Sequence, residues 1–114
     1  MSAKTILDQQ SCIPCRGGIP PLDKTAAETL LTNVPDWKLV ENNLKIQRNY
    51  AFDNFVDALA FTNKLGEISE AENHHPDITL GWGYCTVTFY SHKINGLHEN
   101  DFVMAAKTSK LYNP

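Results

Sequence analysis

Apolar side chains recur at helical spacing in the middle of the chain, and they predict its longest helix. The residues that trace the expected buried stripe are Phe52, Phe55, Val56, Leu59 and Ala60. A stripe of this kind is typical of a helix packed against a core. Asp53 can cap the start of the helix, and good helix formers extend it towards Glu72. Pro76 must stop it, because proline lacks the backbone N–H that a helix interior needs.

Two shorter helices are predicted nearer the ends of the chain. Asp23 is a favourable N-cap for the first of them, and Pro35 ends it. Its apolar positions at helical spacing are Ala26, Ala27, Leu30 and Leu31. The Asn95-Gly96 dipeptide signals a turn before the last helix, which we expect over roughly His98–Lys110. The side chains expected to face inward from this helix are Phe102, Ala105, Ala106 and Ser109.

Alternating apolar and polar positions predict four strands in two pairs. The first pair comprises Trp37–Val40 and Leu44–Tyr50, joined by a turn at residues 41–43. The third strand is expected from the alternation of Ile78, Leu80 and Trp82, with a turn at the glycines 81 and 83. The fourth strand has two faces, which are Cys85, Val87 and Phe89 on one side and Thr86, Thr88, Tyr90 and His92 on the other.

The elements follow one another in the order α-β-β-α-β-β-α. Each pair of strands can close as a hairpin, so no parallel crossover is required. The expected fold class is therefore α+β, a four-stranded antiparallel sheet with three helices packed on one face. Residues 1–22 are expected to form an irregular arm, because prolines and glycines deny them a regular element. Residues 23–114 are expected to form a single domain, as the length predicts.

Composition and charge argue against nucleic acid and membranes as partners of this protein. Of the 114 residues, 42% are apolar and 20% are charged, which is ordinary globular composition. Ten basic and thirteen acidic residues give a net charge of -3, and no basic stripe stands out, so nucleic acid is not an expected partner. No run approaches the roughly 20 apolar residues of a membrane helix, and the first ten residues lack the apolar core of a signal peptide. We therefore expect a soluble, cytoplasmic protein.

The three cysteines fit poorly with a secreted disulfide framework, because their number is odd. Cys12 and Cys15 form a C-x-x-C pair, which in other proteins is half of a zinc site or a redox pair. A second C-x-x-C is missing, and so is the strand–helix context of a thioredoxin-type motif. The favoured interpretation is an arm that carries reduced thiols.

Candidate chemistry is concentrated in the histidines, all four of which lie between positions 74 and 98. His74-His75-Pro76 falls where the long helix must end, and an irregular junction can turn two adjacent rings to the same side. Glu70 lies four residues before His74. A helix that persisted to His74 would set this carboxylate one turn below the ring, where it would accept a ring N–H and select the tautomer.

Two further residues complete the candidate group. His92 is expected at the end of the fourth strand, close to the His74-His75 junction, and Asp101 lies in the first turn of the last helix. Imidazoles exchange protons near neutral pH, and like charges prevent three of them from all being protonated, so one is an acid while another is a base. The group indicates proton transfer on a small molecule or, on ligand type alone, a zinc or iron site. The spacing of the histidines disfavours the metal.

The order of these residues resembles the signature of the pterin-4a-carbinolamine dehydratase family. The shared pattern comprises Glu70-x-x-x-His74-His75-Pro76, Trp82, His92 and Asp101. His92 follows His75 by 17 positions and Asp101 follows His92 by nine, as in that family. Further similar features are Trp37, the aromatic-rich stretch 50–55 and the run 96–101. The resemblance covers roughly residues 24–112, and the arm 12–22 is similar to an extension of some bacterial members.

That resemblance implies a four-stranded antiparallel sheet with helices on one face, assembled as a dimer or tetramer. It implies dehydration of 4a-hydroxytetrahydrobiopterin to quinonoid dihydropterin and water without a metal or an organic cofactor, which recycles the pterin spent by an aromatic amino acid hydroxylase. The catalytic residues that it implies are His74, His75 and His92, supported by Glu70 and Asp101. The substrate-binding residues that it implies are Asn73, His74, His75, Pro76, Ser91 and His92.

The sequence departs from the family pattern at three positions. Asn73 stands where an acidic residue is common, Lys93 stands where some members carry an acid, and His98 replaces a serine that caps the last helix in relatives. Two other classes of function stay open. Some members of the family bind proteins, one of them as a dimerisation cofactor of a transcription factor, and an exposed apolar helix face or sheet edge would favour that class. A metal-dependent enzyme would retain zinc or iron after purification.

Overall fold

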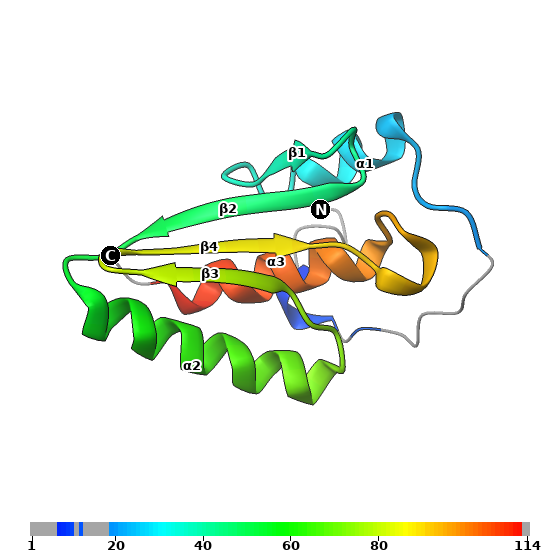
Figure 1. Ribbon diagram of the computed structural model, residues 1–114. Helices are drawn as coiled ribbons and strands as arrows, with labels where there is room; N and C mark the ends of the chain where they lie inside the picture. The colour runs from blue at the N-terminus through cyan, green and yellow to red at the C-terminus, as the bar shows by residue number, and fades with distance from the viewer. Residues whose placement is uncertain (1–6, 11, 13–18, 113–114) are drawn as a thin grey trace.

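The computed structural model describes residues 7–10, 12 and 19–112, and it shows an α+β fold (Figure 1). Four antiparallel strands form one sheet in the order β1-β2-β4-β3. The elements are α1 (Lys24–Leu31), β1 (Lys38–Val40), β2 (Lys45–Ala51), α2 (Phe55–Glu72), β3 (Asp77–Gly81), β4 (Tyr84–Phe89), the 3-10 helix η2 (His92–Ile94) and α3 (Glu99–Leu111). The predicted order of helices and strands and the predicted fold class are confirmed.

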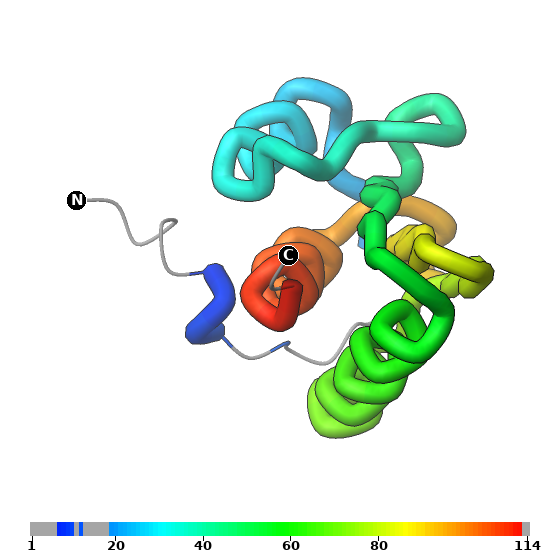
Figure 2. Tube along the Cα trace, turned by 90° about the vertical axis from the view of Figure 1, so that its left-hand side faces the viewer, coloured from blue at the N-terminus to red at the C-terminus, as the bar shows by residue number. Residues whose placement is uncertain are grey.

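The three helices lie on one face of the sheet, with α3 packed between α1 and α2 (Figure 2). Two hairpins, β1-β2 and β3-β4, meet where β2 pairs with β4, so the two central strands come from different halves of the chain. No helix among the described residues is long and apolar enough to cross a membrane.

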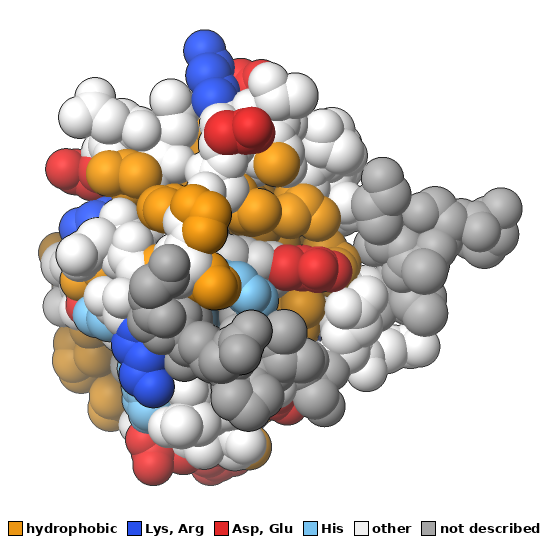
Figure 3. Space-filling view, turned by 90° about the vertical axis from the view of Figure 1, so that its right-hand side faces the viewer, with side chains coloured by type: hydrophobic (Ala, Val, Ile, Leu, Met, Phe, Trp, Pro, Cys, Tyr) orange, Lys and Arg blue, Asp and Glu red, His pale blue; other side chains and the backbone are white. Residues whose placement is uncertain are grey.

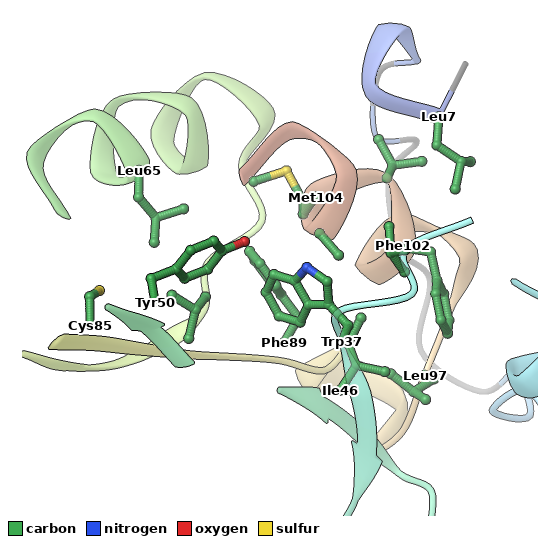
Figure 4. Packing of buried hydrophobic residues seen from close by; sticks show 14 of the residues in the cluster. Leu7, Trp37, Ile46, Tyr50, Leu65, Cys85, Phe89, Leu97, Phe102 and Met104 are labelled. Carbon is green, nitrogen blue, oxygen red and sulfur yellow. The ribbon is translucent and has the colours of Figure 1, made fainter. Parts of the chain in front are cut away.

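The core fills the space between the sheet and the helices (Figure 4). In the register of β2 and β4, Ile46 lies opposite Phe89, and Tyr50 lies opposite Cys85, and all four side chains are buried. Because side chains alternate along a strand, this register turns the apolar face of both central strands towards α3. The face predicted for residues 85–89 is therefore confirmed.

Helix α2 buries a different stripe from the one that the sequence predicted. Its buried side chains are Ala58, Phe61, Leu65 and Ser69, whereas Phe55, Val56 and Leu59 of the predicted stripe are exposed. The helix has apolar residues on two sides, and the second set recurs at a spacing of three, four and four residues that keeps it over the sheet. The N-cap also differs from the prediction. It is Asn54, whose Oδ1 accepts from the backbone N–H of Asp57 at 2.8 Å, rather than Asp53.

Two smaller predictions need correction. Trp82 lies in the turn after β3 and is largely exposed, because the strand already ends at Gly81. In the N-terminal arm, residues 7–9 form a single 3-10 turn instead of irregular chain, and Leu7 is buried in the core. The predicted cap of α1 is confirmed, since Asp23 Oδ1 accepts from the Ala26 N–H at 2.8 Å.

Candidate active site

Three segments that carry the predicted site residues meet at one end of the sheet (Figure 1). They are the C-terminus of α2, the connection that follows β4, and the N-terminus of α3. Asn73 ends α2 in the left-handed region with a φ of 53°, which turns the chain before it reaches His74. Asparagine tolerates this backbone conformation better than most residues do. Asn73 itself is exposed, and Pro76 is partly buried just before β3.

The buried carboxylate of Asp101 organises this end of the molecule. Its Oδ1 lies 2.7 Å from Nε2 of His74, and its Oδ2 accepts from the Ser91 hydroxyl and the His98 backbone N–H, both at 2.9 Å. Asp101 has no solvent exposure. A buried carboxylate with three partners is held in one orientation, and it fixes the tautomer or the charged form of the imidazole that it contacts.

His74 is packed as well as hydrogen bonded. Its ring stacks on Phe89 with 6.1 Å between the centroids and 19° between the planes, and the residue is only 8% exposed. The second ring nitrogen, Nδ1, bonds to no described residue. His74 is therefore fixed by Asp101 and Phe89, while its second ring nitrogen is not hydrogen bonded to any described residue.

The prediction that Glu70 pairs with His74 is wrong. Glu70 Oε2 lies 2.5 Å from Nε2 of His75, and both side chains are at least half exposed. The left-handed Asn73 breaks the helical register, so the residue one turn on from Glu70 is no longer on its face. His74 is directed to Asp101 instead, and each of the adjacent histidines has its own carboxylate.

The sequence predicted His92 at the end of the fourth strand, and this prediction is wrong because β4 already ends at Phe89. His92 begins the 3-10 helix η2, it is exposed, and its ring lies against that of Tyr90 with 4.1 Å between the centroids. The Lys45 ammonium lies 4.4 Å from the centroid of the same tyrosine ring. Within the described part of the chain, His92 has neither a hydrogen bond nor a ring contact with His74 or His75. Histidine side chains reach the surface at this end of the molecule (Figure 3).

The sequence did not predict the contacts that Ser91 and His98 make with Asp101. Ser91 was expected to bind substrate, and here its hydroxyl is used by Asp101 while its backbone closes a bridge with Gly96. His98 caps α3, since its Nδ1 accepts from the Asn100 N–H at 3.0 Å. His98 and Asp101 have the spacing of a capping box, but histidine is not a usual N-cap residue, so the sequence signal was weak. No pattern in the sequence predicted that the ring of Phe89 would stack on that of His74.

The remaining candidate ligands lie apart from one another. No group of three or more His, Cys, Asp or Glu side chains in the described ranges is arranged to hold a metal ion. Cys15 lies outside the described residues. Cys12 is partly buried, its backbone N–H donates to Glu72 at 2.7 Å, and burial together with the nearby carboxylates of Glu72 and Asp101 raises the pKa of its thiol to about 12. This thiol is therefore protonated at neutral pH.

Comparison with known proteins identifies the family. A model of the family described as Pterin 4 alpha carbinolamine dehydratase matches residues 20–111. The chain belongs to the pterin-4a-carbinolamine dehydratase family. It is 57% identical over 105 residues, 92% of both chains, to a Methylococcus capsulatus protein provisionally named as such a dehydratase. A similarly named protein of Halorhodospira halophila is 50% identical over 105 residues, covering 92% of this chain and 96% of its own.

Two solved structures share the fold. A transcriptional coactivator/pterin dehydratase from Brucella melitensis superposes with a TM-score of 0.76 at 26% identity, covering 80% of this chain and 97% of its own. A pterin dehydratase-like protein identified as a RuBisCO assembly factor superposes with a TM-score of 0.58 at 23% identity, covering 67% of this chain and 88% of its own. The names of these two proteins give roles in protein assembly or transcription beside the word dehydratase.

Proposed function

We propose that this protein dehydrates a 4a-hydroxytetrahydropterin to the quinonoid dihydropterin and water. The observation that carries the proposal is the buried His74–Asp101 pair, in which the second imidazole nitrogen is not hydrogen bonded to any described residue. It stands beside the exposed His75–Glu70 pair, in a chain that belongs to a family of dehydratases. Two imidazoles with separate carboxylate partners give two separately oriented groups for proton transfer.

The chemistry of dehydration matches this arrangement. Hydroxide is a poor leaving group, so the oxygen on C4a must receive a proton from an imidazolium as the C–O bond breaks. The lone pair of N5 expels the oxygen as water and forms the C=N bond. A neutral imidazole then takes a proton from the cationic pterin, so that charge and atoms balance. Placed acids and bases of this kind contribute about 10² to 10⁴ each to the rate.

The proposed roles follow from the positions of the side chains. His74 and His75 act at the C4a hydroxyl, while His92 binds the pterin or shares the proton transfer. Asp101 and Glu70 orient the first two imidazoles. Asn73, Pro76 and Ser91 border the substrate, with Ser91 acting through Asp101. All proton donors and acceptors in this scheme belong to the chain, so the proposed reaction needs no metal and no organic cofactor.

Stopped-flow absorbance of 4a-hydroxytetrahydropterin decay tests the proposal. We expect the wild-type protein to accelerate decay, and we expect His74→Ala and His75→Ala each to lose about 10² or more of that gain. His92→Ala tests the third imidazole in the same way. His98→Ser is the matched control, since it removes a histidine from the same end but supplies another good N-cap. A wild-type protein that leaves the spontaneous rate unchanged would exclude the dehydratase function.

A second proposed function is protein binding, and the exposed apolar stripe of α2 favours it. Phe55, Val56 and Leu59 project from one side of this helix, with Val56 72% exposed. Contiguous exposed apolar side chains mark interaction surfaces. We propose that the stripe joins copies of this chain into a dimer or tetramer. We also propose that the protein acts in the cytoplasm, where the recycled pterin serves an aromatic amino acid hydroxylase. Sedimentation velocity over a range of protein concentrations tests the assembly.

A further inference from the structure

Tyr90 follows the end of β4 and lies on the face of the sheet that the helices do not cover. Side chains alternate along a strand, and Phe89, the residue before it, is buried in the core. Tyr90 is therefore directed to the opposite face, where it is partly exposed and is not a member of the hydrophobic core. Contacts at the surface, rather than packing in the core, set the position of its ring.

Two side chains contact the Tyr90 ring. The ring of His92 lies 4.1 Å from it between centroids, with 34° between the planes. The ammonium of Lys45 lies 4.4 Å from the same centroid. The register of β2 and β4 pairs Ile46 with Phe89, and one further step places Lys45 opposite Tyr90. Aromatic pairs and cation–π contacts each contribute about two- to tenfold to an equilibrium, and here both act on one ring.

Lys45 and Tyr90 are not engaged by other polar groups in the described part of the chain. The Lys45 ammonium forms no ion pair with a carboxylate there, and the Tyr90 hydroxyl forms no hydrogen bond. Their polar and ring contacts are therefore confined to the group that they form with His92. The tyrosine contributes to this group through its ring and not through its hydroxyl.

The backbone of His92 is fixed separately from its imidazole. The Ser91 N–H donates to the Gly96 carbonyl at 2.8 Å, and the Ser91 hydroxyl donates to Asp101 at 2.9 Å. The Asn95 N–H donates to the carbonyl of His92 itself at 3.4 Å. These contacts leave the two side-chain torsions of His92 to be set. Among the described residues, Tyr90 is the one whose ring contacts the imidazole.

The three candidate imidazoles are oriented in two different ways. Asp101 contacts a ring nitrogen of His74, and Glu70 contacts a ring nitrogen of His75. The third imidazole, that of His92, lies against an aromatic face, which occupies neither of its nitrogens. Neither nitrogen bonds to a described residue, and the side chain is exposed, so both can hydrogen bond to a ligand.

We propose that Tyr90, supported by Lys45, is a positioning residue that orients His92 for the pterin. This inference rests on the proposed dehydration, in which His92 binds the substrate or shares the proton transfer. Without the tyrosine ring the imidazole would sample its other rotamers, and a catalytic or binding group that is not held in place loses rate. Tyr90 acts through His92 and takes no part in proton transfer.

A double-mutant cycle on kcat/KM of the dehydration tests whether Tyr90 acts through His92. Tyr90→Leu should lower kcat/KM by about three- to tenfold, but by less than about 1.5-fold when His92 is already alanine. Tyr90→Phe keeps the ring and should stay within about twofold of the wild-type protein. Lys45→Met should cost about twofold, and nothing more in the Tyr90→Leu background.

Tyr84→Leu is the matched control. Tyr84 lies on the same face of β4, six positions earlier at the other end of the strand. Its replacement should leave kcat/KM within about twofold of the wild-type value, because it is remote from His92. Both tyrosines lie outside the core, so circular dichroism should show a folded protein in each variant.

Proton NMR gives a second readout that needs no substrate. Protons above an aromatic ring are shielded by its ring current. The imidazole resonance that is missing from His92→Ala should therefore move downfield in Tyr90→Leu and keep its position in Tyr84→Leu.

The outcomes separate this inference from the proposed function. Equal losses in Tyr84→Leu and Tyr90→Leu, an undiminished loss in the His92→Ala background, or an imidazole resonance that does not move would each overturn the role of Tyr90 while the dehydration stands. A wild-type protein that leaves the spontaneous rate unchanged would overturn the dehydration, and the positioning role with it.

Discussion

The carboxylate of Asp101 lies 2.7 Å from Nε2 of His74, and this contact joins the end of α2 to the first turn of α3. The same carboxylate caps α3 through the His98 backbone N–H and accepts the Ser91 hydroxyl. This side chain therefore orients the imidazole proposed for catalysis, and it also joins the chain after α2 to the connection that follows β4 and to α3. We therefore expect changes at Asp101 to affect both the proposed activity and the stability of the fold.

Asp101→Asn should reduce both stability and activity, whereas the same change at an exposed acid in that turn should not. The amide keeps the shape but removes the charge that is paired with His74, and breaking a buried pair costs about 3 kcal/mol of unfolding free energy. The dehydration rate should fall by about 10² or more, because the imidazole loses its fixed tautomer. Urea unfolding and stopped-flow absorbance measure the two effects. Glu99→Gln is the control, since Glu99 is an exposed acid in that turn, and an equal loss in both variants would contradict the assignment.

Glu70→Gln should affect activity without affecting stability. Its contact with His75 is solvent exposed, and such pairs contribute at most about 1 kcal/mol to folding. We expect the rate to fall by about tenfold, because an orienting group supports only part of what the imidazole contributes. The thermal midpoint and the stopped-flow rate measure the two effects. Glu67→Gln is the control, because Glu67 is an exposed acid one turn earlier on the same helix. A rate unchanged in Glu70→Gln would remove Glu70 from the site.

The sequence predicted the strands better than it predicted the contacts of the candidate site residues. Alternation in residues 85–89 identified the buried face of β4, because a central strand has only one way to cover its apolar side chains. Helix α2 had two apolar sides, and periodicity alone does not choose between them. The carboxylate partners of His74 and His75 are determined by the left-handed backbone of Asn73, which redirects both histidines away from the positions that a continued helix would give them.

Val56→Glu should leave the folded monomer intact and disrupt its assembly. Val56 is 72% exposed, so the substitution should change the unfolding free energy of the monomer by no more than about 0.5 kcal/mol. A charge at the centre of an apolar interface is left unpaired and costly, so the proposed dimer or tetramer should dissociate. Sedimentation velocity measures the change. Lys64→Gln on another side of α2 changes the net charge equally, and a sedimentation coefficient that shifts equally in both variants would rule out the stripe as the interface.

Cys12 should be almost unreactive in the folded protein. Burial, followed by the carboxylates of Glu72 and Asp101, raises the pKa of its thiol from 9.0 to about 12, so the thiolate that reacts with iodoacetamide is about 10³ less abundant at pH 8 than in the unfolded chain. In a Cys15→Ser background, mass spectrometry should find Cys12 alkylated rapidly in urea and very slowly without it. Rapid labelling under native conditions would show that the thiol is not buried as described.

The same shift makes a prediction about alkaline stability. The folded thiol keeps a proton that the unfolded thiol releases near pH 9, so the contribution of this group to stability is complete below pH 9 and is lost as the pH rises towards about 12. Between pH 8 and pH 10.5 the unfolding free energy should therefore decrease more for the wild-type protein than for Cys12→Ala, which has no thiol to ionise. Urea titrations of both proteins at the two pH values measure this difference. Equal losses in both proteins would mean that other groups control the alkaline transition, and that burial and the carboxylates of Glu72 and Asp101 do not raise the pKa of this thiol.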